Sequence, residues 1–133
     1  MLNDELLDQL RLTREEIEMQ VEKTRLELER KNELFRHGKE SLSLKEKIVI
    51  ITDDGLASGY SMLAAVRMVK KHGPREVVVA VPTAPMSSVI RVSAEADRIF
   101  SAHVQESGPF AVANAYRYWH DLSEAEVKEM LGN

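Results

Sequence analysis

The stretch from Lys47 to Ser61 constrains the fold of this chain more than any other. It begins with a run of β-branched residues at 48–52, continues through two adjacent acids and two closely spaced glycines, and then becomes apolar at helical spacing. This order predicts a buried strand, a tight turn and the N-terminus of a helix. Such units build the parallel sheets of α/β proteins.

The turn carries groups that an anion would need. Gly55 and Gly59 allow backbone angles closed to other residues and let a ligand approach the main chain. Ser58 and Ser61 add hydroxyl donors at the start of the helix, where unpaired N–H groups and the helix dipole favour a phosphate. Simple helix capping is the alternative role for both serines.

Two adjacent acids precede this loop. Ionised Asp53 and Asp54 only accept hydrogen bonds, so they suit sugar hydroxyls, bound directly or through a hydrated divalent cation. A polar turn after a strand is the simpler interpretation of such a pair. Beside a phosphate loop, however, the two acids favour a sugar phosphate as the ligand.

The segment Asp53-Asp54-Gly55-Leu56-Ala57-Ser58-Gly59-Tyr60-Ser61 resembles the motif with which type I phosphoribosyltransferases bind phosphoribosyl pyrophosphate (PRPP). That motif is a hydrophobic strand, two acids and then Gly-x-Ala-Thr/Ser-Gly-x-Thr/Ser. The runs V-V-V-A-V-P-T-A-P at 77–85 and G-P-F-A-V at 108–112 are similar to the C-terminal half of bacterial and archaeal proteins described as predicted phosphoribosyltransferases. The resemblance covers nearly the whole chain and is weaker before Leu44.

The resemblance implies an enzyme that transfers the phosphoribosyl group from PRPP to a nitrogenous base and releases pyrophosphate with the help of Mg²⁺. Asp53 and Asp54 would be the catalytic residues: both would hold the ribose hydroxyls, and one of them would stabilise positive charge growing on the ring. The 5-phosphate loop would consist of Gly55, Ala57, Ser58, Gly59, Tyr60 and Ser61. Phe110 would contact the acceptor or belong to the core. Mg²⁺ would arrive with PRPP, with no direct protein ligand.

The resemblance also implies that part of the site is absent. In similar proteins the acidic strand is the third of the sheet, and a loop after the first strand contacts pyrophosphate. No such loop precedes Asp53, so the resemblance leaves two functions open: an active enzyme, or a catalytically incomplete fragment that acts as a binding or assembly subunit. We expect the free edge of the 47–52 strand to be covered by a second copy of the chain, by the 1–38 helices or by a separate N-terminal half.

The resemblance implies an α/β fold with an incomplete phosphoribosyltransferase-like, Rossmann-like parallel sheet. The apolar pattern of the sequence predicts about three strands, at 47–52, 75–81 and 98–102. Helices are expected between them, at about 60–72 and 87–96. The aromatic residues after Pro109 favour a further helix.

Helices are also expected near both ends. Residues 1–12 suit a short helix, and Thr13 with Glu16 forms a capping-box pattern that opens a long helix ending at His37-Gly38. Its apolar stripe is narrow and interrupted, which favours packing on the domain or a partner subunit over a coiled coil. Ser123 with Glu126 predicts the cap of a last helix.

Composition sets the remaining bounds. A chain of 133 residues with 44% hydrophobic content suits one domain over 1–133, with residues 1–38 as a helical extension and 45–133 as the α/β core. A net charge of −4 argues against nucleic acid as a partner, and the absence of cysteine excludes disulfides. An acidic start and the lack of a long apolar run indicate a cytoplasmic protein without a membrane span.

Two other nucleotide or phosphate sites do not fit. A phosphoacceptor receiver domain shares the paired acids after a strand, but it needs an aspartate and a lysine after its later strands. Here the later strands lead into Pro82-Thr83 and Ala102-His103. A Walker-type site needs Gly-Lys-Ser/Thr, which the sequence does not contain.

Overall fold

The structure is a computed structural model that describes residues 12–36 and 42–132. Backbone contacts group these residues into two compact units. The sheet unit comprises residues 42–119, and the helical unit comprises the described parts of residues 1–41 and 120–133. The expectation of one domain over 1–133 stays a prediction.

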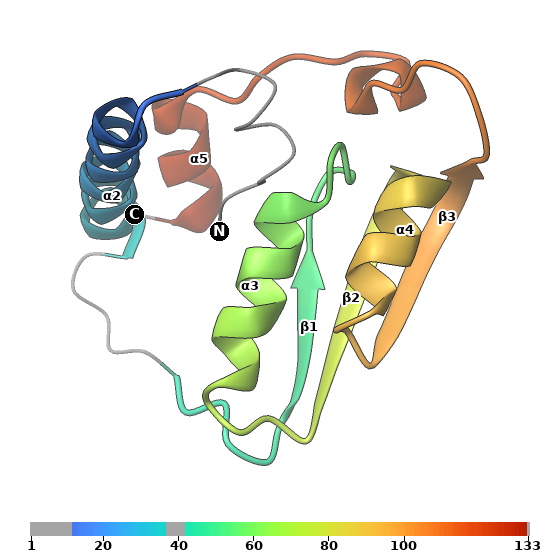
Figure 1. Cartoon of the computed structure of the whole chain (residues 1–133), viewed down its shortest axis with the longest axis horizontal. Coiled ribbons are helices and arrows are strands. Elements are labelled where there is room, and N and C mark those ends of the chain that lie inside the picture. Colours follow the sequence, from blue (N-terminus) through green and yellow to red (C-terminus); the bar gives the residue numbers. More distant parts are fainter. Residues whose placement is uncertain (1–11, 37–41, 133) are drawn as a thin grey trace. The chain divides into compact units, whose positions relative to one another are not determined.

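A three-stranded parallel sheet forms the centre of the sheet unit (Figure 1). Its strands are β1 (Ile48–Thr52), β2 (Glu76–Pro85) and β3 (Arg98–Gln105), in the order β1-β2-β3. Ile50 of β1 lies opposite Val78 of β2. The expected α/β class and the three parallel strands are therefore confirmed.

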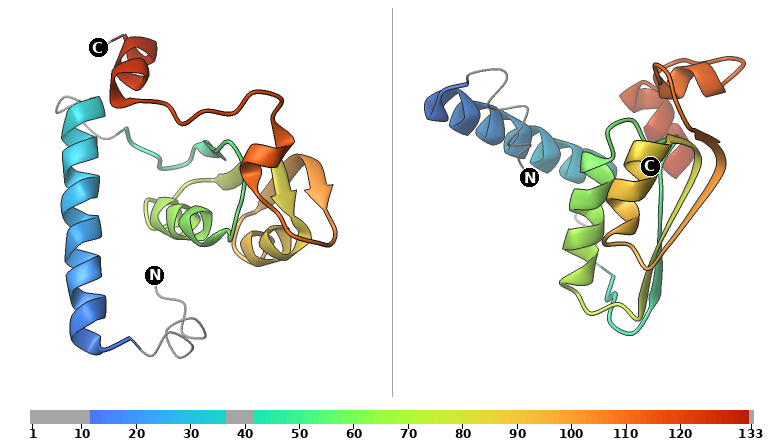
Figure 2. Two further views of the ribbon diagram at one scale, coloured as in Figure 1. Left: turned by 90° about the horizontal axis from the view of Figure 1, so that it is seen from above. Right: turned by 45° about the vertical axis from the view of Figure 1, so that its right-hand side comes forward.

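Two helices cover one face of this sheet. Helix α3 (Tyr60–Lys70) connects β1 to β2, and α4 (Met86–Ser93) connects β2 to β3. Because both connections join neighbouring parallel strands in the same direction and such crossovers are right-handed, both helices lie on the same face (Figure 2). The core between the helices and the sheet consists of Leu56, Met62, Val66, Val69, Val77, Val79, Val81, Ala84, Val92 and Ala96.

The opposite face of the sheet carries exposed apolar side chains. Ile48 is 44% exposed, Ile50 63% and Phe100 54%. Among the described strands, β1 pairs only with β2, so it forms an edge of the sheet. The expectation that a second copy, the 1–38 helices or a separate N-terminal half covers this edge stays a prediction.

Strand β2 is longer than the sequence pattern predicts. The expected strand ended at Val81, but β2 continues to Pro85. Pro82 has no partner in β3, since it has no N–H to donate, yet pairing resumes where Thr83 lies opposite His103. Because β1 has already ended at Thr52, β2 is an edge strand on that side at this point, and edge positions tolerate proline.

The aromatic segment after Pro109 is not the helix that we expected. Only a short 3₁₀ helix, η1 (Val112–Ala115), forms there, and Tyr116 already has an extended backbone. The Tyr116 hydroxyl donates a hydrogen bond to the Asp54 carbonyl oxygen at 2.6 Å, and its ring packs on Trp119. Tertiary contacts with the acidic turn therefore replace the regular hydrogen bonds of a helix.

The helical unit contains the two capped helices that the sequence predicts. Helix α2 (Arg14–Arg36) follows a capping box in which the Glu16 N–H donates to the Thr13 hydroxyl oxygen at 3.2 Å. Helix α5 (Glu124–Leu131) has a second capping box, between Ser123 and Glu126. The expected helix over 1–12, apart from Leu12, and the stop at His37-Gly38 lie outside the described residues.

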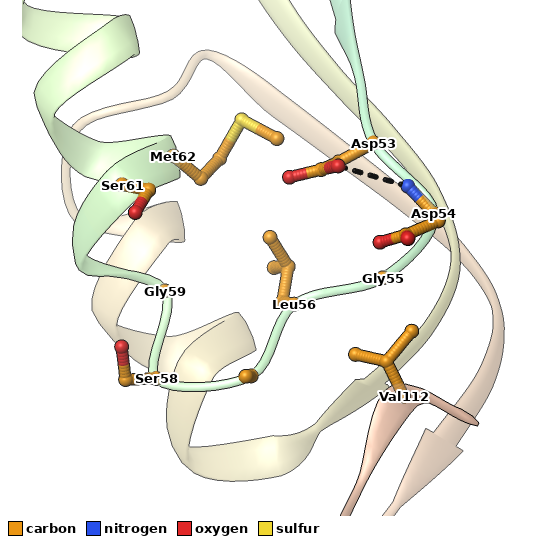
Figure 3. Close-up of a pocket in the computed structure, with 10 residues that line it drawn as sticks. Asp53, Asp54, Gly55, Leu56, Ser58, Gly59, Ser61, Met62 and Val112 are labelled. Atoms are coloured by element: carbon orange, nitrogen blue, oxygen red, sulfur yellow. Dashed lines mark hydrogen bonds between the residues drawn. The ribbon is translucent and has the colours of Figure 1, made fainter. Parts of the chain in front are cut away.

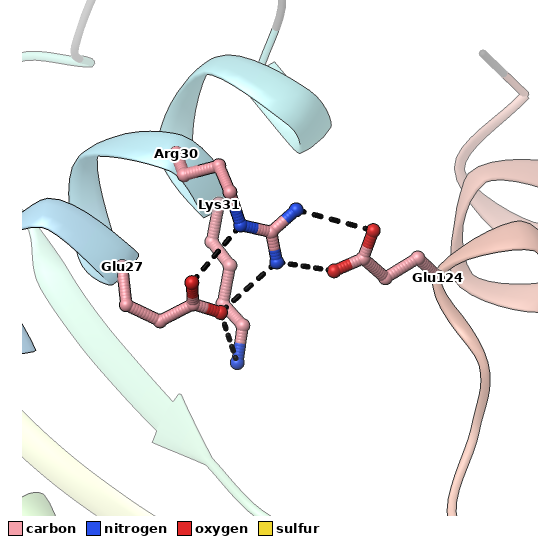
Figure 4. Close-up of polar contacts among 4 residues, drawn as sticks. All are labelled: Glu27, Arg30, Lys31 and Glu124. Atoms are coloured by element: carbon pink, nitrogen blue, oxygen red, sulfur yellow. Dashed lines mark hydrogen bonds and ion pairs between the residues drawn. The ribbon is translucent and has the colours of Figure 1, made fainter.

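An ion pair between Arg30 and Glu124 joins α2 to α5 (Figure 4). The Arg30 guanidinium contacts the Glu27 carboxylate on its own helix, with Nε to Oε2 at 2.9 Å, and the Glu124 carboxylate on α5. These hydrogen bonds from Arg30 lower the pKa of Glu27 to about 2 and lower the pKa of Glu124. Within the described ranges, no helix is both long and apolar enough to cross a bilayer.

Candidate functional site

A cavity opens where β1 ends and α3 begins. Its volume is about 190 Å³, and it lies at the carboxyl end of the strand, where parallel α/β sheets place their ligands. The lining residues form one continuous turn and the first residues of α3, joined by one residue of η1. They are Asp53, Asp54, Gly55, Leu56, Ala57, Ser58, Gly59, Ser61, Met62 and Val112 (Figure 3).

The turn is anchored at its centre and open along its backbone. Leu56 is 2% exposed, and its N–H donates to the Thr83 carbonyl oxygen at 3.0 Å. Gly59 has a φ of 77° and serves as the N-cap of α3 without a side-chain cap. In the described part of the chain, the backbone N–H groups of residues 57–62 donate to no acceptor. A row of donors at a helix N-terminus is therefore available to an anion.

Both serines of the turn are exposed. Neither Ser58 nor Ser61 caps α3, because the N-cap is Gly59 and no side chain accepts from the first turn. The alternative role of simple capping is therefore wrong for both. Their hydroxyl groups line the cavity beside the unpaired amides (Figure 3).

The two acids lie at the other end of the cavity. Figure 3 shows the Asp53 and Asp54 side chains pointing toward the space in front of α3. The Asp54 N–H donates to the Asp53 carboxylate at 3.0 Å, which fixes the first carboxylate against the turn. Tyr116 fixes the second residue through its hydrogen bond to the Asp54 carbonyl. The site thus combines amide donors at one end with carboxylate acceptors at the other.

Two predicted site residues do not line this cavity. The Tyr60 side chain lies instead against Arg91, whose guanidinium carbon is 4.6 Å from the centre of its ring. Phe110 lines a second cavity of about 350 Å³ at the carboxyl ends of β2 and β3. That cavity is bounded by Pro82, Thr83, His103, Gln105, Phe110, Ala111, Asn114, Ala115 and Tyr116. The hydroxyl of Thr83 and Nδ1 of His103 form a 3.2 Å hydrogen bond at its wall.

Residues that line the two cavities pack closely together at Gly55. A Cβ atom on Gly55 would lie 2.8 and 2.9 Å from the methyl groups of Val112, which lines the first cavity. The same atom would lie 3.0 Å from Cγ2 of Thr83, which lines the second. The glycine is therefore required for close packing here, because any side chain would push η1 or β2 away from the acidic turn.

The acids of the turn are the candidate groups for contact with a cation. The described residues contain no group of three or more histidine, aspartate or glutamate side chains that could hold a metal ion. Asp53 and Asp54 are the acids that line the first cavity. Two carboxylates suit a hydrated divalent cation whose other ligands come from a bound phosphate and its hydroxyls.

Sequence reasoning missed some of the residues that shape the cavity. Leu56 stands at a variable position of the motif, and its role is to anchor the turn from within the core. Met62 follows the serine that ends the motif, and the expected start of a helix near Tyr60 was the signal that could have placed Met62 beside the cavity. Val112 is distant in sequence, and the only signal was its place in the G-P-F-A-V segment.

The chain combines a parallel α/β sheet with an amide-rich turn and paired acids at its carboxyl edge, where proteins of this architecture place their ligands. A family model described as "Phosphoribosyl transferase domain" matches residues 2–115 of this chain. The chain therefore belongs to the phosphoribosyl transferase domain family.

The chain is also similar to individual proteins of known sequence or structure. Two curated proteins from two strains of Mycobacterium tuberculosis, whose names provisionally assign them as phosphoribosyl transferases, are 33% identical over 130 residues. The match covers 98% of this chain and 29% of each relative. The crystal structure of TT1426 from Thermus thermophilus is 31% identical, has a TM-score of 0.75, and matches 90% of this chain and 57% of that one. The chain thus spans less than a third of the length of the curated relatives that it matches.

Proposed function

We propose that this chain binds PRPP or another ribose 5-phosphate group in the cavity between β1 and α3. The observation that carries the proposal is the run of unpaired N–H groups at 57–62, whose residues other than Tyr60 line a cavity with two carboxylates at its other end. The amides and the α3 dipole bind the 5-phosphate. A volume of about 190 Å³ suits a small sugar phosphate, since pockets for larger ligands hold roughly 300–1,000 Å³.

Asp53 and Asp54 accept hydrogen bonds from the ribose hydroxyls in this proposal. Their negative charge also stabilises the positive charge that develops on the sugar ring as the bond to pyrophosphate breaks. Mg²⁺, which would arrive with PRPP and have no direct protein ligand, would offset the charge of the pyrophosphate. No covalent enzyme intermediate is required, because a nitrogen of the acceptor base attacks the ring carbon directly.

The acceptor base occupies the second cavity in this proposal. Phe110 and Tyr116 supply aromatic surface there, while Thr83 and His103 supply polar groups at the wall. Flat heterocycles bind well between aromatic and polar groups of this kind. Because Val112 of the first cavity and Thr83 of the second both pack at Gly55, the two proposed binding positions are neighbours.

Binding without transfer is the second candidate function. Among the described residues, two carboxylates and no lysine or arginine line the first cavity, so this part of the chain offers no cationic contact for pyrophosphate there. The curated relatives and TT1426 are also longer than their match to this chain. A second polypeptide segment that supplies the missing contacts would make the site catalytic, and without it the chain would act as a binding or assembly subunit.

Calorimetric titration separates these functions. The chain is titrated with PRPP and Mg²⁺ and with ribose 5-phosphate, and the variant Asp53→Asn/Asp54→Asn is titrated in parallel. Asp121→Asn is the matched control, since Asp121 is an exposed aspartate in the helical unit. Heat with both ligands that disappears only in the double variant supports the site, and pyrophosphate release with a panel of bases supports transfer. No heat with either ligand would refute the proposal.

A further inference from the structure

We propose that Ser88 and Arg91 of α4 are positioning residues that orient the phosphate-binding amides of the neighbouring turn. The proposal rests on the function proposed above and adds two residues that do not touch the ligand. Neither residue lines the cavity, and neither belongs to the motif that identifies the turn.

Helix α4 supports the turn from outside the cavity. The Ser88 hydroxyl donates a hydrogen bond to the Ala57 carbonyl oxygen at 2.5 Å, and Ser88 itself is 1% exposed. The Arg91 guanidinium donates to the Ser58 carbonyl oxygen. Two consecutive carbonyl groups of the turn are therefore held toward α4.

Because each peptide unit is planar, the bonds to the Ala57 and Ser58 carbonyl groups also set the direction of the N–H groups that follow them. In a planar trans peptide the C=O and the following N–H point in opposite directions. Holding the Ala57 and Ser58 carbonyls toward α4 therefore directs the N–H groups of Ser58 and Gly59 away from it. Both N–H groups lack an acceptor in the described chain, and both residues line the cavity. The bonds from α4 thus fix donors that would otherwise rotate with the turn.

Close packing holds the turn against the same helix. A Cβ atom on Gly59 would lie 3.3 Å from both the Cβ of Ser88 and the Cγ2 of Val92, so only a glycine approaches α4 this closely without displacing it. The positive φ of Gly59, 77°, also favours glycine. The turn is therefore seated on α4 by packing as well as by hydrogen bonds.

Arg91 also places a positive charge behind the turn. Its guanidinium carbon lies 4.6 Å from the centre of the Tyr60 ring, which holds the side chain over the first residue of α3. Within residues 12–36 and 42–132, the first cavity is lined by two carboxylates and by no cationic side chain. A guanidinium bound to the Ser58 carbonyl polarises that peptide and partly offsets the repulsion between a bound phosphate and the two acids.

Variants of Ser88 and Arg91, together with two control variants, test the proposal. Ser88→Ala removes the buried hydroxyl, and Arg91→Met removes the donor and the charge but keeps a similar stem. Ser87→Ala is the control for Ser88→Ala, since Ser87 is an exposed serine on α4. Arg75→Gln is the control for Arg91→Met, since Arg75 is an exposed arginine that precedes the first residue of β2. Dissociation constants for ribose 5-phosphate are measured by calorimetry well below the melting temperature, and backbone order parameters of the turn are measured by NMR without ligand.

The loss of one hydrogen bond is expected to weaken ribose 5-phosphate binding about three- to tenfold in Ser88→Ala and in Arg91→Met, while both controls bind as the unmodified chain does. Arg91→Lys, which keeps a charge and a donor, is expected to bind better than Arg91→Met. Order parameters at residues 57–59 are expected to fall in Ser88→Ala from the value of about 0.85 typical of rigid backbone.

Three results would overturn the inference. If the unmodified chain binds and the Ser88 and Arg91 variants bind equally well, the positioning role is wrong while the proposed function survives. If the unmodified chain binds no ribose 5-phosphate, the proposed function and the positioning role both fail. Unchanged order parameters at 57–59 in Ser88→Ala would refute the support of the turn by α4 whether or not a ligand binds.

Discussion

Replacing Gly55 by alanine is expected to destabilise the sheet unit by direct steric overlap. Carbon atoms in contact normally lie about 3.5–4.0 Å apart. The new Cβ would lie at 2.8 and 2.9 Å from the Val112 methyls and at 3.0 Å from Cγ2 of Thr83. Valine is stiff about its side-chain bond, so η1 or the acidic turn has to move by several tenths of an ångström.

Such overpacking costs about 1–3 kcal/mol. With a urea dependence of about 1–3 kcal/mol per molar, a loss of about 2 kcal/mol lowers the unfolding midpoint by roughly 1 M. The measurement is urea unfolding followed by circular dichroism and, for the sheet unit, by NMR signals from β2. An unchanged midpoint for Gly55→Ala would contradict the packing of η1 against the turn.

A double-mutant cycle isolates the contact. Val112→Ala alone costs about 1 kcal/mol or less, because the side chain is half-buried and loses only two methyl groups. In Gly55→Ala/Val112→Ala the two closest overlaps are gone, so the double variant is expected to be more stable than the sum of the single effects by about 1 kcal/mol. Additivity to within about 0.3–0.5 kcal/mol would show that the two residues do not interact.

Three further perturbations test other parts of the structure. Ser123→Ala removes the cap of α5 and is expected to cost about 1 kcal/mol of stability, measured by urea unfolding. The hydrogen bond from Arg30 lowers the pKa of Glu27 from 4.5 to about 2. The contribution of this pair to the stability of the folded chain is therefore complete above about pH 4.5 and is lost as the pH falls toward 2. NMR titration of the Glu27 carboxylate measures this pKa. Tyr116→Phe removes the hydrogen bond to the Asp54 carbonyl and is expected to cost about 0.5–1.5 kcal/mol in urea unfolding.

Each perturbation has a control. Ser107→Ala removes an exposed serine hydroxyl that caps no helix, and a loss as large as that of Ser123→Ala would contradict the capping role. Arg30→Gln should return the Glu27 pKa toward 4.5, and an unchanged titration would show that Arg30 is not the cause. Tyr118→Phe is the control for Tyr116→Phe, because Tyr118 is 86% exposed; equal effects would argue against the hydrogen bond.

The strands, the first helix of the sheet unit and both capping boxes were predictable because their signals are local. The β-branched run at 48–52, the acids after it and the glycine-rich turn together specify a strand, a bend and a helix. Thr13 and Ser123 are each followed by a glutamate three residues later, which is the pattern of a capping box. No distant residue is needed to explain these features.

The sequence did not predict features that depend on distant contacts. Pro82 indicated a strand end, but pairing of β2 with β3 beyond it outweighs the missing N–H. The aromatic residues after Pro109 indicated a helix, whereas the hydrogen bond from the Tyr116 hydroxyl to the Asp54 carbonyl favours an extended chain. Ser88 and Arg91 show no sequence pattern that links them to the turn. They approach it only because the chain changes direction between the end of β2 and the start of α4.

The central claim is that the unpaired amides at 57–62 bind the phosphate of a ribose 5-phosphate group, and amide NMR tests it most directly. Adding ribose 5-phosphate to the ¹⁵N-labelled chain is expected to shift the signals of residues 57–62 most strongly, with smaller shifts at Asp53 and Asp54. Ribose without the phosphate should leave residues 57–62 unmoved. Saturating ribose 5-phosphate that moves none of these amide signals, or only signals elsewhere, would contradict the account.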